Sequence, residues 1–218
     1  MTEPLFSLES WGRFPKERNR LFQSVAESKR QGVFFISGDV HFGEISRYDC
    51  AVGYPLHDVT SSGLTQAIEK AVPWPLNLIV KFMAWWTPTT MRVMNQNCRF
   101  RSCTYGQPNF GTIEINWNAS PAILKLEVRD VNGIPVTGIQ FPLTELQSLT
   151  NNAVTSVNKL KGGYQRYCTL EIDRPWIIRH RLSSLFYSVI FVMLLAVVGL
   201  AYASLSIFRW HVFKRKLD

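Results

Sequence analysis

Two residues that can hold a metal ion, Asp39 and His41, stand two positions apart just after a short apolar run. A carboxylate is a hard ligand and an imidazole a borderline one, so the pair suits iron, manganese, zinc or calcium. Gly38, directly before them, permits a tight backbone turn. The alternative is a polar turn that caps a strand, because Asp-x-His also occurs without any metal. Asp39 and His41 are thus the candidate metal ligands and catalytic residues.

Other acidic and histidine side chains offer weaker candidates. Glu44 is placed to orient the neighbouring imidazole through a hydrogen bond, or it is a solvated glutamate. His57 and Asp58 follow a predicted strand, where a satisfied polar turn is the expected role. His180 and His211 flank a long apolar segment and are expected to lie at a membrane interface.

The elements before Asp39 are those that would position it. Residues 14–32 are predicted to form a helix, with Pro15 at its first position and Gly32 as its end. Residues 33–37 are a continuous apolar run of strand length, as in a sheet covered on both faces. Ligands of open α/β sheets bind beyond the carboxyl ends of strands, which is where Asp39 stands.

The middle of the chain is predicted in less detail. A second strand is expected within residues 44–52, a turn at Ser61-Ser62-Gly63, and a helix opening within 64–71. Residues 72–90 are apolar and aromatic but interrupted by three prolines and a lysine. Ordinary packing is favoured for this stretch over a lid or an element that rests on a membrane.

The later part of the chain alternates between apolar and polar residues, as half-buried strands do. A strand is predicted at residues 109–117, and a hairpin over 122–143 turns at Asn132-Gly133. Residues 144–163 are polar and weakly periodic, which indicates a loop or linker. One last strand is predicted at 164–173.

Five segments in this order resemble the PhoD-like alkaline phosphatases, a family within the calcineurin-like metallophosphatases. The resemblance covers roughly residues 8–145 and implies an α/β fold: a partial metallophosphatase sandwich, its C-terminal half, with a mixed sheet and a β-hairpin. The segments are WGRFPKERNRLFQSV (11–25), FFISGDVHFGEIS (34–46), VTSSGLT (59–65), NFGTIEINW (109–117) and LEVRDVNG (126–133).

The resemblance also implies a chemistry. Members hydrolyse phosphate monoesters or diesters at a centre of two metals, described with iron and calcium, to which Asp39 and His41 would contribute. Two metals polarise the phosphoryl oxygens and place a bound hydroxide in line with the leaving group.

The chain departs from the family in one respect: the family's other metal ligands come from earlier sequence blocks that do not occur here. We therefore expect an incomplete chain that is inactive alone, with the missing N-terminal half as its partner. The alternatives are a non-catalytic, membrane-tethered binding module and a structural membrane protein.

A C-terminal segment without any charged residue, 182–208, is long enough to cross a bilayer as one helix. The alternative is a buried core helix. The expected organisation is a phosphatase-like part at 1–146, a polar linker with a possible last strand at 147–181, the membrane helix at 182–208 and a basic tail at 209–218.

Charge and cysteine content bear on the partners and the compartment. The net charge of +8 is partly concentrated at the two flanks of the apolar segment and shows no basic stripe, so a lipid bilayer is expected as partner and nucleic acid is not. Cys98 and Cys103 either form a disulfide or remain two free thiols, and their spacing does not suit zinc. Asn118 begins an Asn-x-Ser acceptor for glycosylation.

The orientation in the membrane depends on where the natural chain starts. If Met1 is the true start, the domain is cytosolic and anchored by its tail. If a longer form carries a signal peptide, the domain is luminal or extracellular. We expect the second placement, because a Cys98–Cys103 disulfide and a glycan on Asn118 both require it.

Overall fold

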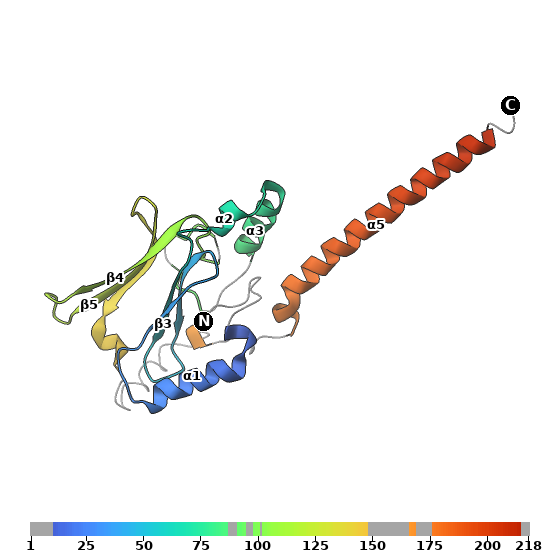
Figure 1. The fold of residues 1–218 in the computed structure, drawn as a ribbon. Helices are drawn as coiled ribbons and strands as arrows, with labels where there is room; N and C mark the ends of the chain where they lie inside the picture. Colours follow the sequence, from blue (N-terminus) through green and yellow to red (C-terminus); the bar gives the residue numbers. More distant parts are fainter. Residues whose placement is uncertain are drawn as a thin grey trace. The chain divides into compact units, whose positions relative to one another are not determined.

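The computed structural model describes residues 11–86, 91–94, 98–100, 102–147, 166–168 and 176–214. The chain divides into two units, Met1–Asp173 and Arg174–Asp218. The first unit contains two small three-stranded sheets with short helices, and the second is a single long helix (Figure 1). The fold class is therefore mixed α/β.

The first unit opens with a short 3-10 helix, η1 (Trp11–Arg13), and then helix α1 (Pro15–Glu27). Pro15 occupies the first turn, where its missing N–H costs no hydrogen bond, as predicted. The helix ends before Gly32, because Lys29 adopts a left-handed conformation (φ 53°) that stops the helical ladder.

The first sheet has strands β1 (Phe35–Ser37), β2 (Gly43–Tyr48) and β3 (Leu56–Ser61) in the order β1-β3-β2. Strand β1 runs parallel to β3, and β2 runs antiparallel to it. The prediction that β1 is covered on both faces is wrong, since its middle residue, Ile36, is 72% exposed. The strand also lies at the edge of the sheet.

The first residue of the predicted Ser61-Ser62-Gly63 turn is the last residue of a strand. Strand β3 continues to Ser61, so the turn begins at least one residue later than expected. Five of its six residues are buried, and three of these are polar, His57, Asp58 and Thr60. A strand buried on both faces with polar side chains shows no apolar alternation, which explains why the sequence did not indicate it.

The second sheet is an antiparallel meander of β4 (Asn109–Asn116), β5 (Ile123–Asp130) and β6 (Pro135–Pro142), which confirms the predicted strand and hairpin. The short 3-10 helix η2 (Leu143–Leu146) follows β6. Side chains from both sheets share one core, so the sheets form a two-layer sandwich. Its central members are Ile45, Val59, Leu124, Leu126 and Val128.

The hairpin between β5 and β6 turns at Asn132-Gly133, as predicted. Gly133 has φ +79°, and the Asp130 carboxylate accepts the backbone N–H groups of Asn132 and Ile134 at 2.9 and 2.8 Å. A Cβ added at Gly133 would have no atom within 4 Å, so only the backbone conformation demands glycine here.

Replacing Gly133 with alanine is expected to lower the free energy of unfolding by about 1 kcal/mol, because a Cβ disfavours the left-handed region. The control is Gly133→Asn, since asparagine tolerates that region and should lose less. Urea unfolding of the full chain in detergent measures both. Equal losses for the two variants would contradict the backbone explanation.

Two helices connect the sheets, α2 (Ile68–Ala71) and α3 (Trp74–Trp86), and Figure 1 shows them at the opposite end of the strands from α1. The expectation of ordinary packing for residues 72–90 is wrong within α3. Six of its large apolar side chains are exposed, and Trp74 is 78% exposed.

Two disulfides link the four cysteines. Cys98–Cys103 confirms one of the two alternatives left open by the sequence, and Cys50–Cys168 was not anticipated. Cys168 ends the 3-10 helix η3 (Arg166–Cys168), so these three residues are not in the strand predicted at 164–173. The rest of that strand and residues 148–163 of the predicted linker lie outside the described residues.

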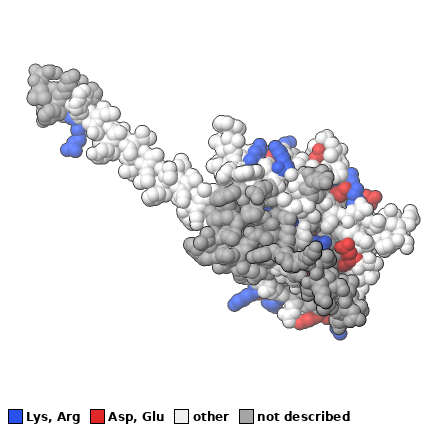
Figure 2. Space-filling model, turned by 180° about the vertical axis from the view of Figure 1, so that it is seen from behind, with Lys and Arg blue, Asp and Glu red and all other residues white. Residues whose placement is uncertain are grey.

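The second unit is helix α5 (Trp176–Lys214), of which Tyr187–Trp210 is long and apolar enough to cross a membrane. None of the apolar window is buried within the structure, which contradicts the alternative of a core helix. In Figure 2 the described part of α5 contains almost no charged side chains, whereas Lys, Arg, Asp and Glu side chains mix on the described surface of the other unit.

Candidate functional site

The two predicted ligands lie on the loop that leaves β1 and enters β2. Asp39 (φ 70°) and His41 (φ 60°) both adopt the left-handed conformation, which is uncommon outside glycine. Such residues cost about 1–3 kcal/mol each and gather at functional sites, where the surrounding structure holds them in place. The loop therefore presents its carboxylate and imidazole from a constrained backbone.

Hydrogen bonds fix His41 at three atoms. Its backbone N–H donates to Ser62 Oγ at 2.8 Å, and its carbonyl accepts the N–H of Ile68 at 2.9 Å. Its ring Nδ1 lies 2.9 Å from the carbonyl oxygen of Gln66. A carbonyl can only accept, so Nδ1 carries the proton and, in the neutral ring, the lone pair is on Nε2.

This arrangement is the one that metal-binding histidines commonly show, with the second ring nitrogen held by a backbone carbonyl. His41 is half-buried, while the Asp39 side chain is exposed. The sequence did not identify Ser62 and Gln66 as residues of the site. The Ser-Ser-Gly segment could have indicated them, because the turn after β3 brings both residues beside the loop.

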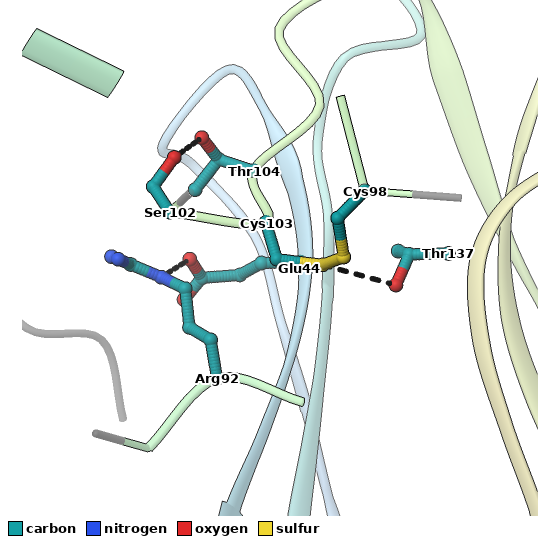
Figure 3. The surroundings of a disulfide bond; sticks show 7 residues. All are labelled: Glu44, Arg92, Cys98, Ser102, Cys103, Thr104 and Thr137. Carbon is teal, nitrogen blue, oxygen red and sulfur yellow. Dashed lines mark hydrogen bonds and ion pairs between the residues drawn. A yellow bond between two sulfur atoms is a disulfide. The ribbon is translucent and has the colours of Figure 1, made fainter. Parts of the chain in front are cut away.

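Glu44 does not have the role that the sequence offered for it. It lies fully buried in β2 and forms an ion pair with Arg92, which is 1% exposed (Figure 3). Ser46 Oγ also donates to the Glu44 carboxylate at 3.4 Å. Burial raises the pKa of Glu44, although the charge of Arg92 opposes this shift. Neither alternative holds, since Glu44 is not solvated and its side chain is directed to Arg92 and Ser46.

His57 and Asp58 belong to β3 rather than to a turn after a strand, which corrects the prediction. Both are completely buried. The His57 ring stacks on Phe141 with 4.4 Å between centroids, and burial lowers its pKa to about 3, with a further contribution from Arg47. Asp58 accepts a hydrogen bond from Ser37 Oγ at 2.7 Å. His57 is therefore a neutral core residue at physiological pH.

The donor set fits a metal ion only in part. Asp39 and His41 supply one oxygen and one nitrogen ligand of suitable chemistry. Among the described residues, no three His, Cys, Asp or Glu side chains are grouped so that they could hold a metal ion. A metal bound at this loop would need further ligands from outside the described residues, because four or more are usual.

The remaining predicted positions are the glycosylation acceptor Asn118, two histidines beside the apolar segment and a pair of cysteines. Asn118 is exposed at the turn after β4, as a glycosylation acceptor must be. His180 is exposed on α5, and nothing is described for the side chain of His211. Cys98 and Cys103 form a disulfide that lies beside Thr137 of β6 (Figure 3).

No protein-family model matches the chain, and neither a curated protein nor a solved structure gives a match to it.

Proposed function

We propose that the chain is part of a membrane-anchored, metal-dependent phosphoester hydrolase to which Asp39 and His41 contribute metal ligands. The observation that carries this proposal is the left-handed conformation of both residues, together with the carbonyl that holds His41 Nδ1. A polar cap of a strand requires neither feature. The partial metallophosphatase sandwich suggested by the resemblance is part of the proposal, supported by the two packed sheets.

The chain's own residues position the ligands. Ser62 and Gln66 hold the backbone and ring of His41, so Nε2 is directed by two hydrogen bonds rather than by rotation of a free side chain. The exposed Asp39 provides a hard oxygen ligand. A bound metal would activate water for attack on phosphorus and neutralise the phosphate charge.

The placement that we propose for the sandwich is luminal or extracellular, with Tyr187–Trp210 as the anchor. Two disulfides favour an oxidising compartment, because thiols in the cytosol are kept reduced. The exposed Asn118 is accessible to glycosylation only on that side of the membrane.

Metal binding by the full chain in detergent tests the proposal. With Mn²⁺ as the probe, electron spin echo spectra should show modulation from a directly bound nitrogen, and His41→Asn should abolish it. Asp39→Asn should weaken binding, whereas Glu114→Gln, which alters an exposed carboxylate on β4, should not. Asparagine tolerates the left-handed backbone, so both loop variants should keep the fold. Unchanged nitrogen modulation in His41→Asn would exclude the assignment.

A second candidate function is a non-catalytic, membrane-tethered binding module. The exposed edge strand β1, with Ile36 open to solvent, favours it because such an edge can pair with a strand from a partner. Hydrolysis of a generic phosphate ester separates the two candidates. Turnover by a complex of the chain with its partner, lost in His41→Asn, supports the hydrolase, and a stable complex without turnover supports the module.

A further inference from the structure

Helix α3 is attached to the protein by its polar side. Asn77 donates its side-chain N–H to the Glu69 carbonyl, and Lys81 lies 3.8 Å from the Glu69 carboxylate. One turn further on, Ala84 is buried and its carbonyl accepts the Ser102 N–H at 3.2 Å. Positions 77, 81 and 84 share one helical face, so this face contacts the rest of the unit.

The opposite side of α3 is apolar and exposed. Its large side chains are between 48% and 78% exposed, which reverses the usual arrangement of a surface helix. Phe82 and Trp85 lie side by side on this surface, with ring centroids 6.1 Å apart. The exposed residues are Trp74, Leu76, Leu78, Ile79, Phe82 and Trp85, and we call them the α3 apolar face.

Cations surround the point where α3 is attached. Lys81 and Arg99 both approach the Glu69 carboxylate, at 3.8 and 3.7 Å, and Lys70 beside it is exposed. Three basic residues thus lie near the buried Glu69 carboxylate, at the place where α3 is attached. An apolar helix face with tryptophans and basic residues near it is typical of helices that lie in the headgroup region of a bilayer.

We propose that the α3 apolar face inserts into the outer layer of the membrane that α5 spans. A bilayer is the partner that we assign to this face, because the same polypeptide contains Tyr187–Trp210, a helix long and apolar enough to cross a membrane. The basic residues complement anionic headgroups. The proposal does not depend on the metal site, since it uses none of the residues of the loop after β1.

Insertion of α3 into the bilayer would also affect the loop that carries Asp39 and His41. The residues that lead into α3 are connected to the loop of His41, because Ile68 at the start of α2 donates to the His41 carbonyl. Insertion of α3 would therefore fix the orientation of this loop relative to the lipid surface.

Spin labels on single introduced cysteines test the proposal, because all four native cysteines are in disulfides. The full chain is reconstituted in vesicles of phosphatidylcholine with phosphatidylserine, and it is labelled at Phe82→Cys or Leu78→Cys. Val131→Cys is the matched control, since Val131 is a 64% exposed apolar residue in the β5–β6 turn. All three positions are exposed, so the substitutions should not disturb the core.

Labels on α3 should collide with oxygen severalfold more, relative to a water-soluble nickel chelate, than the label at Val131. This is the pattern of a site buried about 5–10 Å into the headgroup region. An equal ratio at all three positions would show that α3 faces water and would overturn the proposal. Exclusion of both reagents, with spin–spin broadening that disappears on dilution in lipid, would assign the face to a second copy of the chain instead.

Discussion

Replacing Arg92 with methionine is expected to lower the free energy of unfolding by about 3–5 kcal/mol, because it leaves a buried carboxylate without its partner charge. Glu44 is fully buried in β2, and Arg92 is the cation paired with it. The Glu44→Leu/Arg92→Met double variant should recover most of the loss, since removing both charges removes the uncompensated burial. Urea unfolding of the full chain in detergent, followed by near-ultraviolet circular dichroism, measures the series.

The loss in Arg92→Met should depend on pH in a defined direction. Burial raises the pKa of Glu44 above its ordinary value of 4.5 in the folded protein, and without Arg92 it rises further. A raised folded-state pKa means that the stability linked to this group is complete below 4.5 and falls as pH rises through the folded value. The variant should thus be less impaired at acidic than at neutral pH.

The control for this series is an exposed ion pair. Arg20 and Glu17 lie on the surface of α1, 2.9 Å apart, with side chains that are 76% and 56% exposed. Arg20→Met should leave the unfolding midpoint unchanged, because solvent screens such pairs. If Arg92→Met also left the midpoint unchanged at neutral pH, the buried Glu44–Arg92 pair would contribute no more to stability than the exposed one.

Removing the Cys50–Cys168 disulfide is expected to be the second large perturbation. The bridge closes a loop with a sequence separation of 118, so its loss should cost about 5 kcal/mol in the chain-entropy model. The Cys98–Cys103 bridge, with a separation of 5, should cost about 2 kcal/mol in the same model. Each Cys→Ala pair is compared with the wild type by urea unfolding.

The two disulfide variants serve as controls for each other. Both replace a pair of cysteines by alanines, and they differ mainly in the length of the loop that is released. An equal or larger loss for Cys98→Ala/Cys103→Ala would show that local packing around Thr137 and Ser102, rather than unfolded-state entropy, determines the stability.

Local signals in the sequence predicted the parts of the fold that depend on neighbouring residues. The turn at Asn132-Gly133 was predictable because its φ requirement is met by the glycine itself. The start of helix α1 was predictable from Pro15, but its end was not. The helix stops because Lys29 adopts a left-handed conformation, which a lysine in the sequence does not predict.

The predictions that failed concern elements whose structure depends on residues far away in the sequence. Strand β3 hides His57 and Asp58 inside the protein, where Phe141 and Ser37 accommodate them, and no local pattern shows this. Four cysteines permit three pairings, so Cys50–Cys168 could not be deduced. The periodicity of α3 groups its apolar residues, but the contacts of Glu69 and the burial of Ala84 are needed to show which side faces inward.

The candidate site falls between these cases. The residue types and position of Asp39 and His41 were apparent, because an apolar run stops directly before them. The left-handed backbone of the loop and the carbonyl of Gln66 that holds the ring come from the folded arrangement of β3 and the chain that follows it. Glu44 looked equivalent to its neighbours in sequence and was separated from them only by the position of Arg92.

The Cys50–Cys168 bond also makes a covalent ring of the chain between these two cysteines. A single cut in the backbone inside this ring, for example at the exposed Val131 in the β5–β6 turn, would leave both pieces joined through the bond. Strands β1 and β2, which precede Cys50, would then stay covalently linked to helix α5. After such a cut, only reduction of the bond would separate the N-terminal residues from α5.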